Sequence, residues 1–325
     1  MSESRMRAFS SDEWTLVALA LSKLPGIGRR RLRRALAMLR QSTLDSEDRG
    51  SEQLDEVLRL AALPAIAPSA RDQAWDAALR MQDRCWQQNW HVYVFGGARY
   101  PSPLLRSSDP PALLFGEGVP ITVAVPRVAI VGTRQPTEWG RETAAACARL
   151  CAERGAVVVS GLAVGIDAEA HAAVVAAHGT TWATLPCGLD RLYPPEHRDL
   201  AAQIVDAGGT LISEYWPGSG ARRDRFIERD RLQVGLSGLL LVVEAGRRGG
   251  TQHTIGFAPA ADVPIWVALP DAAVAGSPAP VQLGTFDLWR GGSPRVTAAA
   301  LEAWIVEARS SLSTTDGAHA TTSLF

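Results

Sequence analysis

Between residues 127 and 268, apolar segments typical of strands alternate with helical segments, and this pattern limits the possible folds. Strands that are apolar throughout are typical of a parallel sheet that helices cover on both faces. The expected strands are 128–131, 156–160, 181–185, 210–213, 239–243 and 265–268. The sequence therefore predicts an α/β class fold, an extended Rossmann-like doubly wound parallel sheet, in which ligands bind at the carboxyl ends of the strands.

The segments on either side of this sheet have different patterns. Apolar residues recur at helical spacing through the first 80 residues, with a break at Leu24-Pro25-Gly26-Ile27-Gly28. Two further short strands are expected at 91–95 and 112–115. After the sheet, a stretch rich in Pro, Gly and Ala precedes one helix, near 296–309, and a Ser/Thr-rich tail that is expected to be disordered. The predicted organisation is an N-terminal helical domain at 1–80, a Rossmann-like domain at 90–270, and a linker, helix and tail at 271–325.

Composition limits the kinds of partner. The 325 residues carry a formal net charge of −1, so a surface for nucleic acid must be a local patch. Almost all the positive charge is arginine, since Lys23 is the only lysine. The chain lacks a signal-like N-terminus and an apolar run long enough to cross a bilayer, which predicts a cytoplasmic protein with no membrane contact. Four cysteines without a CxxC pair predict buried, reduced thiols and no metal site.

Two loops at the expected carboxyl edge have the construction of an anion site. The first expected strand leads into Gly132–Thr137 and the second into Ser160–Asp167, and each loop precedes a helix. Exposed amides and the dipole at a helix N-terminus favour a phosphate, and Arg134 would add a charge-assisted contact. The alternative is that the glycines only form tight turns. Neither loop reads GxGxxG or GxxxxGK[ST], which argues against NAD and ATP and predicts no cofactor.

The loops also carry a specific family resemblance. The ordered segments VAIVGTRQPTEWGRE, VVSGLAVGIDAEAH, LPCGLDRLYPPEHRDL, LISEYWPG and FIERDRLQVGLSGLLLVVEAGRRGGT resemble the DprA/Smf family of DNA-processing proteins over roughly residues 90–270. The segment LSKLPGIGRRRLRRAL resembles the helix-hairpin-helix (SAM-like) element that often precedes that domain. The resemblance implies a homodimeric protein that binds single-stranded DNA and loads the recombinase RecA during natural transformation. Many family members also end in a winged helix, which we do not expect here because one C-terminal helix and a polar tail cannot build that domain.

Site residues follow from the resemblance position by position. It implies DNA or phosphate contacts at Gly132, Thr133, Arg134, Ser160, Gly161, Gly165, Asp167, Arg229 and Arg231. A possible second ligand loop comprises Glu244, Gly249, Gly250, Thr251 and His253. The alternative for the arginines of the RDR triplet is a solvated face paired with neighbouring acids. Three positions depart from the family pattern, because Asp230 replaces an asparagine, Val164 often a basic residue, and Gln252 a leucine.

The same residues give little sign of an enzyme. None of the loops places a nucleophile beside a base, so we expect no catalytic residues. Glu214 and Glu244 end neighbouring strands, but helix capping or pairing with arginine is the simpler interpretation. A second hypothesis is a DprA-like paralogue that regulates a neighbouring-gene toxin or serves antiviral defence. A third is a nucleotide sensor or N-glycosidic nucleotide hydrolase, although Gly249-Gly250-Thr251-Gln252 lacks the GGxGTxxE pattern of that group.

Overall fold

The computed structural model describes residues 11–40 and 50–319 and divides the chain into two compact units. Unit 1 comprises the residues up to 100 together with 109–116, and unit 2 comprises 101–108 and the chain from residue 117 onward. Among the described residues, no helix has the length and hydropathy that crossing a membrane requires.

Unit 1 contains the four helices that the apolar spacing predicts. They are α1 Ser11–Leu21, α2 Arg29–Leu39, α3 Gln53–Leu60 and α4 Pro68–Gln87. The short strand β1 Trp90–Val94 follows, and the chain returns to the unit with β2, Leu113–Gly118. The expected domain boundary at residue 80 lies inside α4, whose buried residues include Met81 and Cys85. Unit 1 therefore extends beyond the helices to include the β1 region.

Unit 2 is built on six parallel strands in the order β6-β5-β4-β3-β7-β8. The strands are β3 Arg127–Gly132, β4 Val157–Ser160, β5 Thr181–Leu185, β6 Thr210–Ser213, β7 Leu239–Val243 and β8 Ile265–Ala268. Its helices are α5 Glu138–Glu153, α6 Ile166–Ala176, α7 Arg198–Asp206, α8 Arg223–Gly235, α9 Gly250–Phe257, α10 Asp271–Val274, α11 Leu283–Arg290 and α12 Ala298–His319. The predicted fold class is confirmed. The strand order reverses beside β3, which is where such sheets place a ligand.

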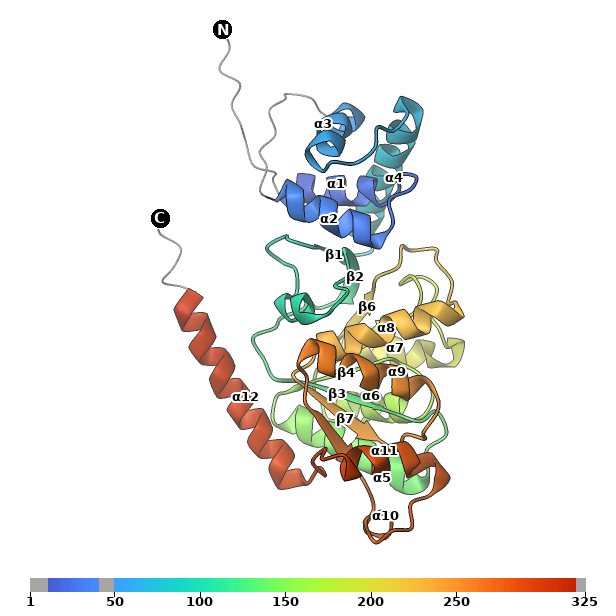
Figure 1. The fold of residues 1–325 in the computed structure, drawn as a ribbon, viewed down its shortest axis with the longest axis vertical. Helices are drawn as coiled ribbons and strands as arrows, with labels where there is room; N and C mark the ends of the chain where they lie inside the picture. Colours follow the sequence, from blue (N-terminus) through green and yellow to red (C-terminus); the bar gives the residue numbers. More distant parts are fainter. Residues whose placement is uncertain (1–10, 41–49, 320–325) are drawn as a thin grey trace. The chain divides into compact units, whose positions relative to one another are not determined.

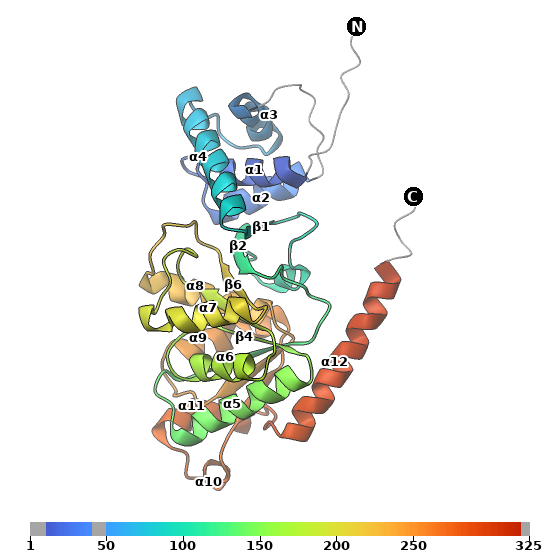
Figure 2. The same ribbon diagram turned by 180° about the vertical axis from the view of Figure 1, so that it is seen from behind.

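Alternate residues of the central strands face opposite cores. On β3, Val128 and Ile130 pack against α5, α6 and α12, whereas Ala129 and Val131 pack against α8 and α9. Figure 1 shows α8 and α9 over one face of the sheet, and Figure 2 shows α5, α6 and α7 over the other. Both faces of the strands are buried, which explains why the strands are apolar throughout rather than alternating.

From its composition we expected the segment 271–294 to be a linker. The structure shows instead that it is folded. It contains α10 and α11, and Ala273 joins a buried cluster with Val267 and Leu269 of the β8 region. The Thr285 hydroxyl accepts a hydrogen bond of 2.6 Å from the amide of Ala245. The segment is therefore part of the folded unit 2, because its few apolar and polar side chains find partners on β7 and β8.

The C-terminal helix is longer than expected. We predicted a helix near 296–309 and a disordered tail after it, but α12 continues to His319. The hydroxyls of Ser310, Ser311 and Ser313 donate to carbonyl oxygens three or four residues earlier, which satisfies these polar side chains within the helix. The prediction of disorder is therefore wrong for 310–319, and 320–325 lie outside the described residues.

Candidate nucleic-acid interface

A cavity of about 860 Å³ lies at the carboxyl edge of the sheet in unit 2. Gly132 at the end of β3 lies opposite Val243 at the end of β7, so the loops that follow these strands meet at one edge. The predicted site residues in its lining are Gly132, Thr133, Arg134, Asp167, Arg229, Gly249, Gly250, Thr251 and His253. The structure therefore brings together residues from four separate loops and helices that the sequence singled out.

The cavity lining is rich in positive charge although the whole chain is nearly neutral. Its arginines are Arg134, Arg222, Arg223, Arg229 and Arg248, and its carboxylates are Asp167 and Asp230. Arg134, Arg222, Arg223 and Arg248 are exposed. Arginines gathered around a concave surface attract anions, because low-dielectric walls focus their field. Three of these arginines, 222, 223 and 248, were not among the predicted site residues.

The N-terminus of α5, which we expected to meet a phosphate, is already occupied by Glu244. The Glu244 carboxylate accepts hydrogen bonds from the amide of Thr137 at 2.8 Å and from the Thr137 hydroxyl at 2.6 Å. Gln282 donates to the same carboxylate at 2.8 Å. Glu244 is fully buried and has a φ of 50°, an unusual backbone angle that turns its side chain under the helix. Glu244 is therefore a capping residue and not part of the ligand loop.

The N-terminus of α6 also contains a carboxylate of its own. Asp167 lies in the first turn of α6, and the amide of Gly161 donates to its Oδ2 at 3.1 Å. Ser160 is fully buried and donates to the carbonyl of Ile130, so it does not line the cavity. Gly165 has a φ of 86° and lies against Thr133. Ser160 and Gly165 therefore shape the loop rather than face a ligand.

The helix N-terminus that opens into the cavity is that of α9. Gly249 has a φ of 126°, and both Gly249 and Gly250 have open space where a side chain would stand. The first amides of a helix have no partner within the helix, so an anion can accept hydrogen bonds from them. Thr251 and His253 line the same part of the cavity. The loop that we placed second is therefore the one with free room for a phosphate.

A buried cluster of one arginine and two carboxylates forms the floor of the cavity. Arg229 is 3% exposed, and its guanidinium lies 3.9 Å from Asp167 and 3.6 Å from Asp230. A side chain at Gly161 would collide with this guanidinium, which explains the glycine there. Burial raises the pKa of Asp167 and raises the pKa of Asp230 to about 6, against the opposing effect of Arg229. Burial therefore disfavours the charged form of both carboxylates, and the positive charge of Arg229 offsets this only in part.

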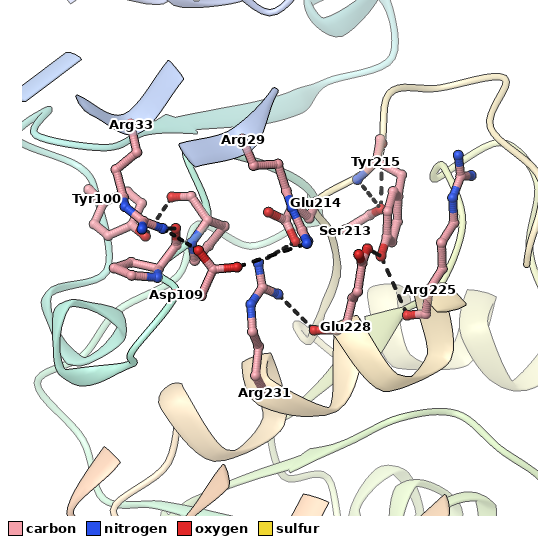
Figure 3. A network of polar contacts seen from close by, with 12 residues as sticks. Arg29, Arg33, Tyr100, Asp109, Ser213, Glu214, Tyr215, Arg225, Glu228 and Arg231 are labelled. Carbon is pink, nitrogen blue, oxygen red and sulfur yellow. Dashed lines mark hydrogen bonds and ion pairs between the residues drawn. The ribbon is translucent and has the colours of Figure 1, made fainter. Parts of the chain in front are cut away.

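Arg231 does not belong to this site. Its side chain is 5% exposed and forms an ion pair of 2.6 Å with Glu214, as Figure 3 shows. It also donates to the carbonyl of Glu228, whose own carboxylate accepts from the Tyr215 hydroxyl. Arg229 and Arg231 are two residues apart on α8, so their side chains leave different sides of the helix. We predicted both in the groove, and the prediction is wrong for Arg231.

An aromatic ledge on the rim of the cavity was not predicted. Tyr193 and Phe226 pack edge to face with ring centroids 5.4 Å apart, and the Arg134 guanidinium lies 5.5 Å from the Phe226 ring. Tyr193 is 42% exposed. Nothing in the sequence spacing joins residues 193 and 226, which approach only because both follow strands that end at the same edge.

The buried His171 and the cysteines have structural roles. His171 is fully buried, its Nδ1 lies 2.8 Å from the Thr181 hydroxyl, and burial lowers its pKa to about 3, so it is a neutral core residue. Cys85, Cys151 and Cys187 are buried free thiols, as predicted, whereas the free thiol Cys147 is only partly buried. Among the residues that the structure describes, no group of His, Cys, Asp and Glu side chains has an arrangement suited to a metal ion.

In unit 1, two arginines of the arginine-rich helix α2 contact other residues of the same unit. Arg33 forms an ion pair of 2.5 Å with Asp109, as Figure 3 shows. Arg33 also donates to the carbonyl of Pro110. Arg31 donates to the carbonyl of Gly26 and so braces the hairpin turn. These contacts engage Arg31 and Arg33 within unit 1.

Sequence comparison covers the whole region of this site. Residues 91–297, more than half of the chain, match the family of DNA recombination-mediator protein A. The chain belongs to this family. The DprA/Smf resemblance is therefore confirmed. Protein Smf of Synechocystis is 39% identical over 49% of this chain and 41% of its own length, and protein Smf of Escherichia coli is 36% identical over 52% and 46%. The matches thus span less than half the length of these two relatives.

Solved structures of the DprA family have the same fold. The structure of DprA from Streptococcus pneumoniae has a TM-score of 0.69 at 24% identity and covers 91% of this chain and 97% of that one. DprA from Helicobacter pylori, whose structure is described in terms of a single-stranded DNA binding mode, has a TM-score of 0.59 at 25% identity and covers 67% of this chain and 96% of that one. The DprA likeness therefore extends from the sequence motifs to the architecture.

Proposed function

We propose that this chain binds single-stranded DNA in the cavity at the carboxyl edge of its sheet and acts in DNA recombination. The observation that carries the proposal is the ring of exposed arginines around the open N-terminus of α9. Phosphates would lie between Arg134 and Arg248, where the amides of Gly250 and Thr251 can donate to them. These contacts bind the backbone without reading sequence.

The aromatic ledge favours a single strand over a duplex. Tyr193 presents an exposed ring beside Phe226 and Arg134. An unpaired base has a free face that stacks on such rings, whereas the bases of a duplex are already stacked on one another. Basic groups combined with exposed aromatic rings are typical of proteins that bind single strands without strong sequence preference. The single-stranded DNA binding of the Helicobacter pylori relative agrees with this proposal.

We infer binding rather than catalysis, because the carboxylates that were candidates for acid–base chemistry are engaged in structure. Glu244 holds the N-terminus of α5, and Glu214 pairs with Arg231. His253 lines the cavity and is exposed, which suits contact with a phosphate or base. Its neighbour Gln252 donates to the carbonyl of Gly246 and is fixed in the loop. These residues support a binding surface and offer no activated nucleophile.

The experiment that tests this function compares single-stranded and double-stranded DNA. Fluorescence anisotropy with a labelled oligonucleotide, alone and annealed to its complement, should give tighter binding to the single strand. Equal affinity for the two forms would mean that the aromatic ledge takes no part. Absence of binding to both at low salt would favour the second hypothesis, a paralogue whose fold serves a protein partner.

The family membership also leads us to propose a homodimer that delivers single-stranded DNA to a RecA-type recombinase. Light scattering of the full chain at micromolar concentration should then give twice the mass of one chain. A monomer at that concentration would contradict the dimer. The recombinase would be detected as a ternary complex that forms only in the presence of DNA, which separates this partner from a protein that binds the chain alone.

A further inference from the structure

Unit 1 contains a second groove that the cavity at the sheet edge does not involve. It lies between α1, the end of α4 and β1, and has a volume of about 260 Å³. Three tryptophans line it, Trp14 of α1, Trp86 of α4 and Trp90 of β1, together with Arg99. This volume is below the ~300–1,000 Å³ usual for pockets that enclose a drug-sized ligand, so the groove suits a single ring system.

Two tryptophans of this groove are unusual, one in its exposure and the other in the lack of a hydrogen bond at its indole N–H within the described residues. Trp86 is 83% exposed, by far the most exposed of the large apolar side chains in the described residues. Trp90 is only 8% exposed, and its indole N–H has no hydrogen-bond partner within the described part of the chain. Buried indole N–H groups normally have a hydrogen-bond partner, because a buried donor without a hydrogen bond costs free energy. The groove thus presents one exposed aromatic face, and its lining includes a tryptophan whose buried indole N–H has no partner among the described residues.

Positive groups accompany these rings. The guanidinium of Arg84 lies 5.3 Å from the centre of the Trp90 ring, and that of Arg99 lies 5.9 Å from the centre of the Tyr93 ring. Asp12 also lines the groove, so its net charge is close to zero. Stacking rather than charge alone must therefore account for any ligand that binds there.

We propose that this groove is a second nucleic-acid site, in which an unpaired base of single-stranded DNA stacks on Trp86. A nucleobase suits the groove because it has a flat π face for the exposed Trp86 ring, and its carbonyl or ring-nitrogen acceptors would give the buried Trp90 N–H a partner once that ring turns toward the groove. The phosphate that accompanies the base would meet Arg99. An aliphatic peptide side chain would cover the Trp86 ring but would leave the Trp90 N–H without a hydrogen bond. The groove adds to the proposed function, and its test does not depend on the cavity of unit 2.

The first test is the affinity of the full chain for a single-stranded oligonucleotide of roughly 16 nucleotides, which exceeds the footprint of one site. Trp86→Ala should weaken binding about 5-fold or more, the usual effect of removing one stacking platform. Trp86→Phe should restore most of the affinity because it keeps an aromatic face. Leu79→Ala is the matched control, since Leu79 is a 43% exposed apolar residue on the same helix. An abasic oligonucleotide should bind the Trp86→Ala chain and the unchanged chain equally.

A second test separates this site from the cavity of unit 2. The Trp86→Ala loss should persist in an Arg134→Glu background, where binding through the cavity is weakened. Photo-crosslinking with an oligonucleotide that contains 5-iododeoxyuridine should yield adducts within residues 82–99, and Trp86→Ala should remove them. Unchanged affinity in both backgrounds, with adducts confined to unit 2, would overturn the proposal even if the cavity binds DNA as expected.

Discussion

Replacing Arg134 with glutamate is expected to weaken binding of single-stranded DNA more than any other single change in unit 2. Arg134 is exposed at the rim of the cavity and lies over the Phe226 ring, so it can meet a phosphate and flank a stacked base at once. Loss of one such contact typically costs ~1–3 kcal/mol, and the reversed charge adds repulsion to that loss. We therefore expect a decrease in affinity of more than about 10-fold, measured by fluorescence anisotropy.

The matched control for this substitution is Arg149→Glu. Arg149 is exposed on α5 and is not among the residues that line the cavity, so the control changes the net charge by the same amount at another place. It should alter affinity little, because charges beyond a Debye length of ~8–10 Å are screened at ordinary ionic strength. If the two variants lose affinity equally, the effect is one of overall charge and the cavity is not the binding site.

The second large effect concerns Asp230, whose negative charge opposes the proposed ligand. Asp230 lines the cavity, and burial raises its pKa to about 6. A carboxylate roughly 8 Å from a phosphate costs ~1 kcal/mol at an effective dielectric constant of about 40. Asp230→Asn should therefore tighten DNA binding about 5-fold at pH 8. The unchanged chain should gain the same affinity as pH falls through 6, whereas the Asp230→Asn variant should show a smaller change.

The same substitution is expected to stabilise the folded chain at high pH. The pKa of Asp230 is higher in the folded chain than the ordinary value of 3.8, so its contribution to stability is present at low pH and is lost as pH rises through about 6. Asp230→Asn should raise the free energy of unfolding at pH 8 by at most ~3 kcal/mol, and the difference should vanish near pH 4. Urea denaturation at the two pH values measures it. A destabilised variant at pH 8 would show instead that the contact with Arg229 outweighs the cost of burying the charge.

The sequence predicted the architecture of unit 2 well because both faces of its sheet are covered. Strands such as β7 must be apolar at every position when helices pack on each side, and such runs stand out in the sequence. The segment 271–294 was misjudged because its role depends on distant partners. Ala273 and Thr285 stabilise that segment through contacts with β8 and Ala245, and Pro- and Gly-rich composition does not reveal such contacts.

The sequence predicted which loops form the site, but not which helix N-terminus stays open or which side chains meet there. Loop positions after parallel strands told us that Arg134, Asp167 and the Gly249–Thr251 loop converge, since topology alone places them at one edge. Which helix N-terminus remains open depends on where buried carboxylates point. Glu244 reaches the α5 terminus through its unusual backbone angle, and that angle has no signature in the sequence. The approach of Tyr193 to Phe226 is likewise a product of folding and could not be read from spacing.

The salt dependence of single-stranded DNA binding tests whether the phosphates lie in this cavity. Each phosphate that an arginine neutralises releases condensed counterions, so the logarithm of the association constant falls linearly with the logarithm of salt concentration, by ~0.7 per contact for single strands. With phosphate contacts at Arg134 and Arg248, we predict a slope of about −1.4 and a slope about 0.7 smaller in magnitude for Arg248→Gln. A slope that Arg248→Gln and Arg134→Glu both leave unchanged would contradict the account, because the phosphates would then lie outside this cavity.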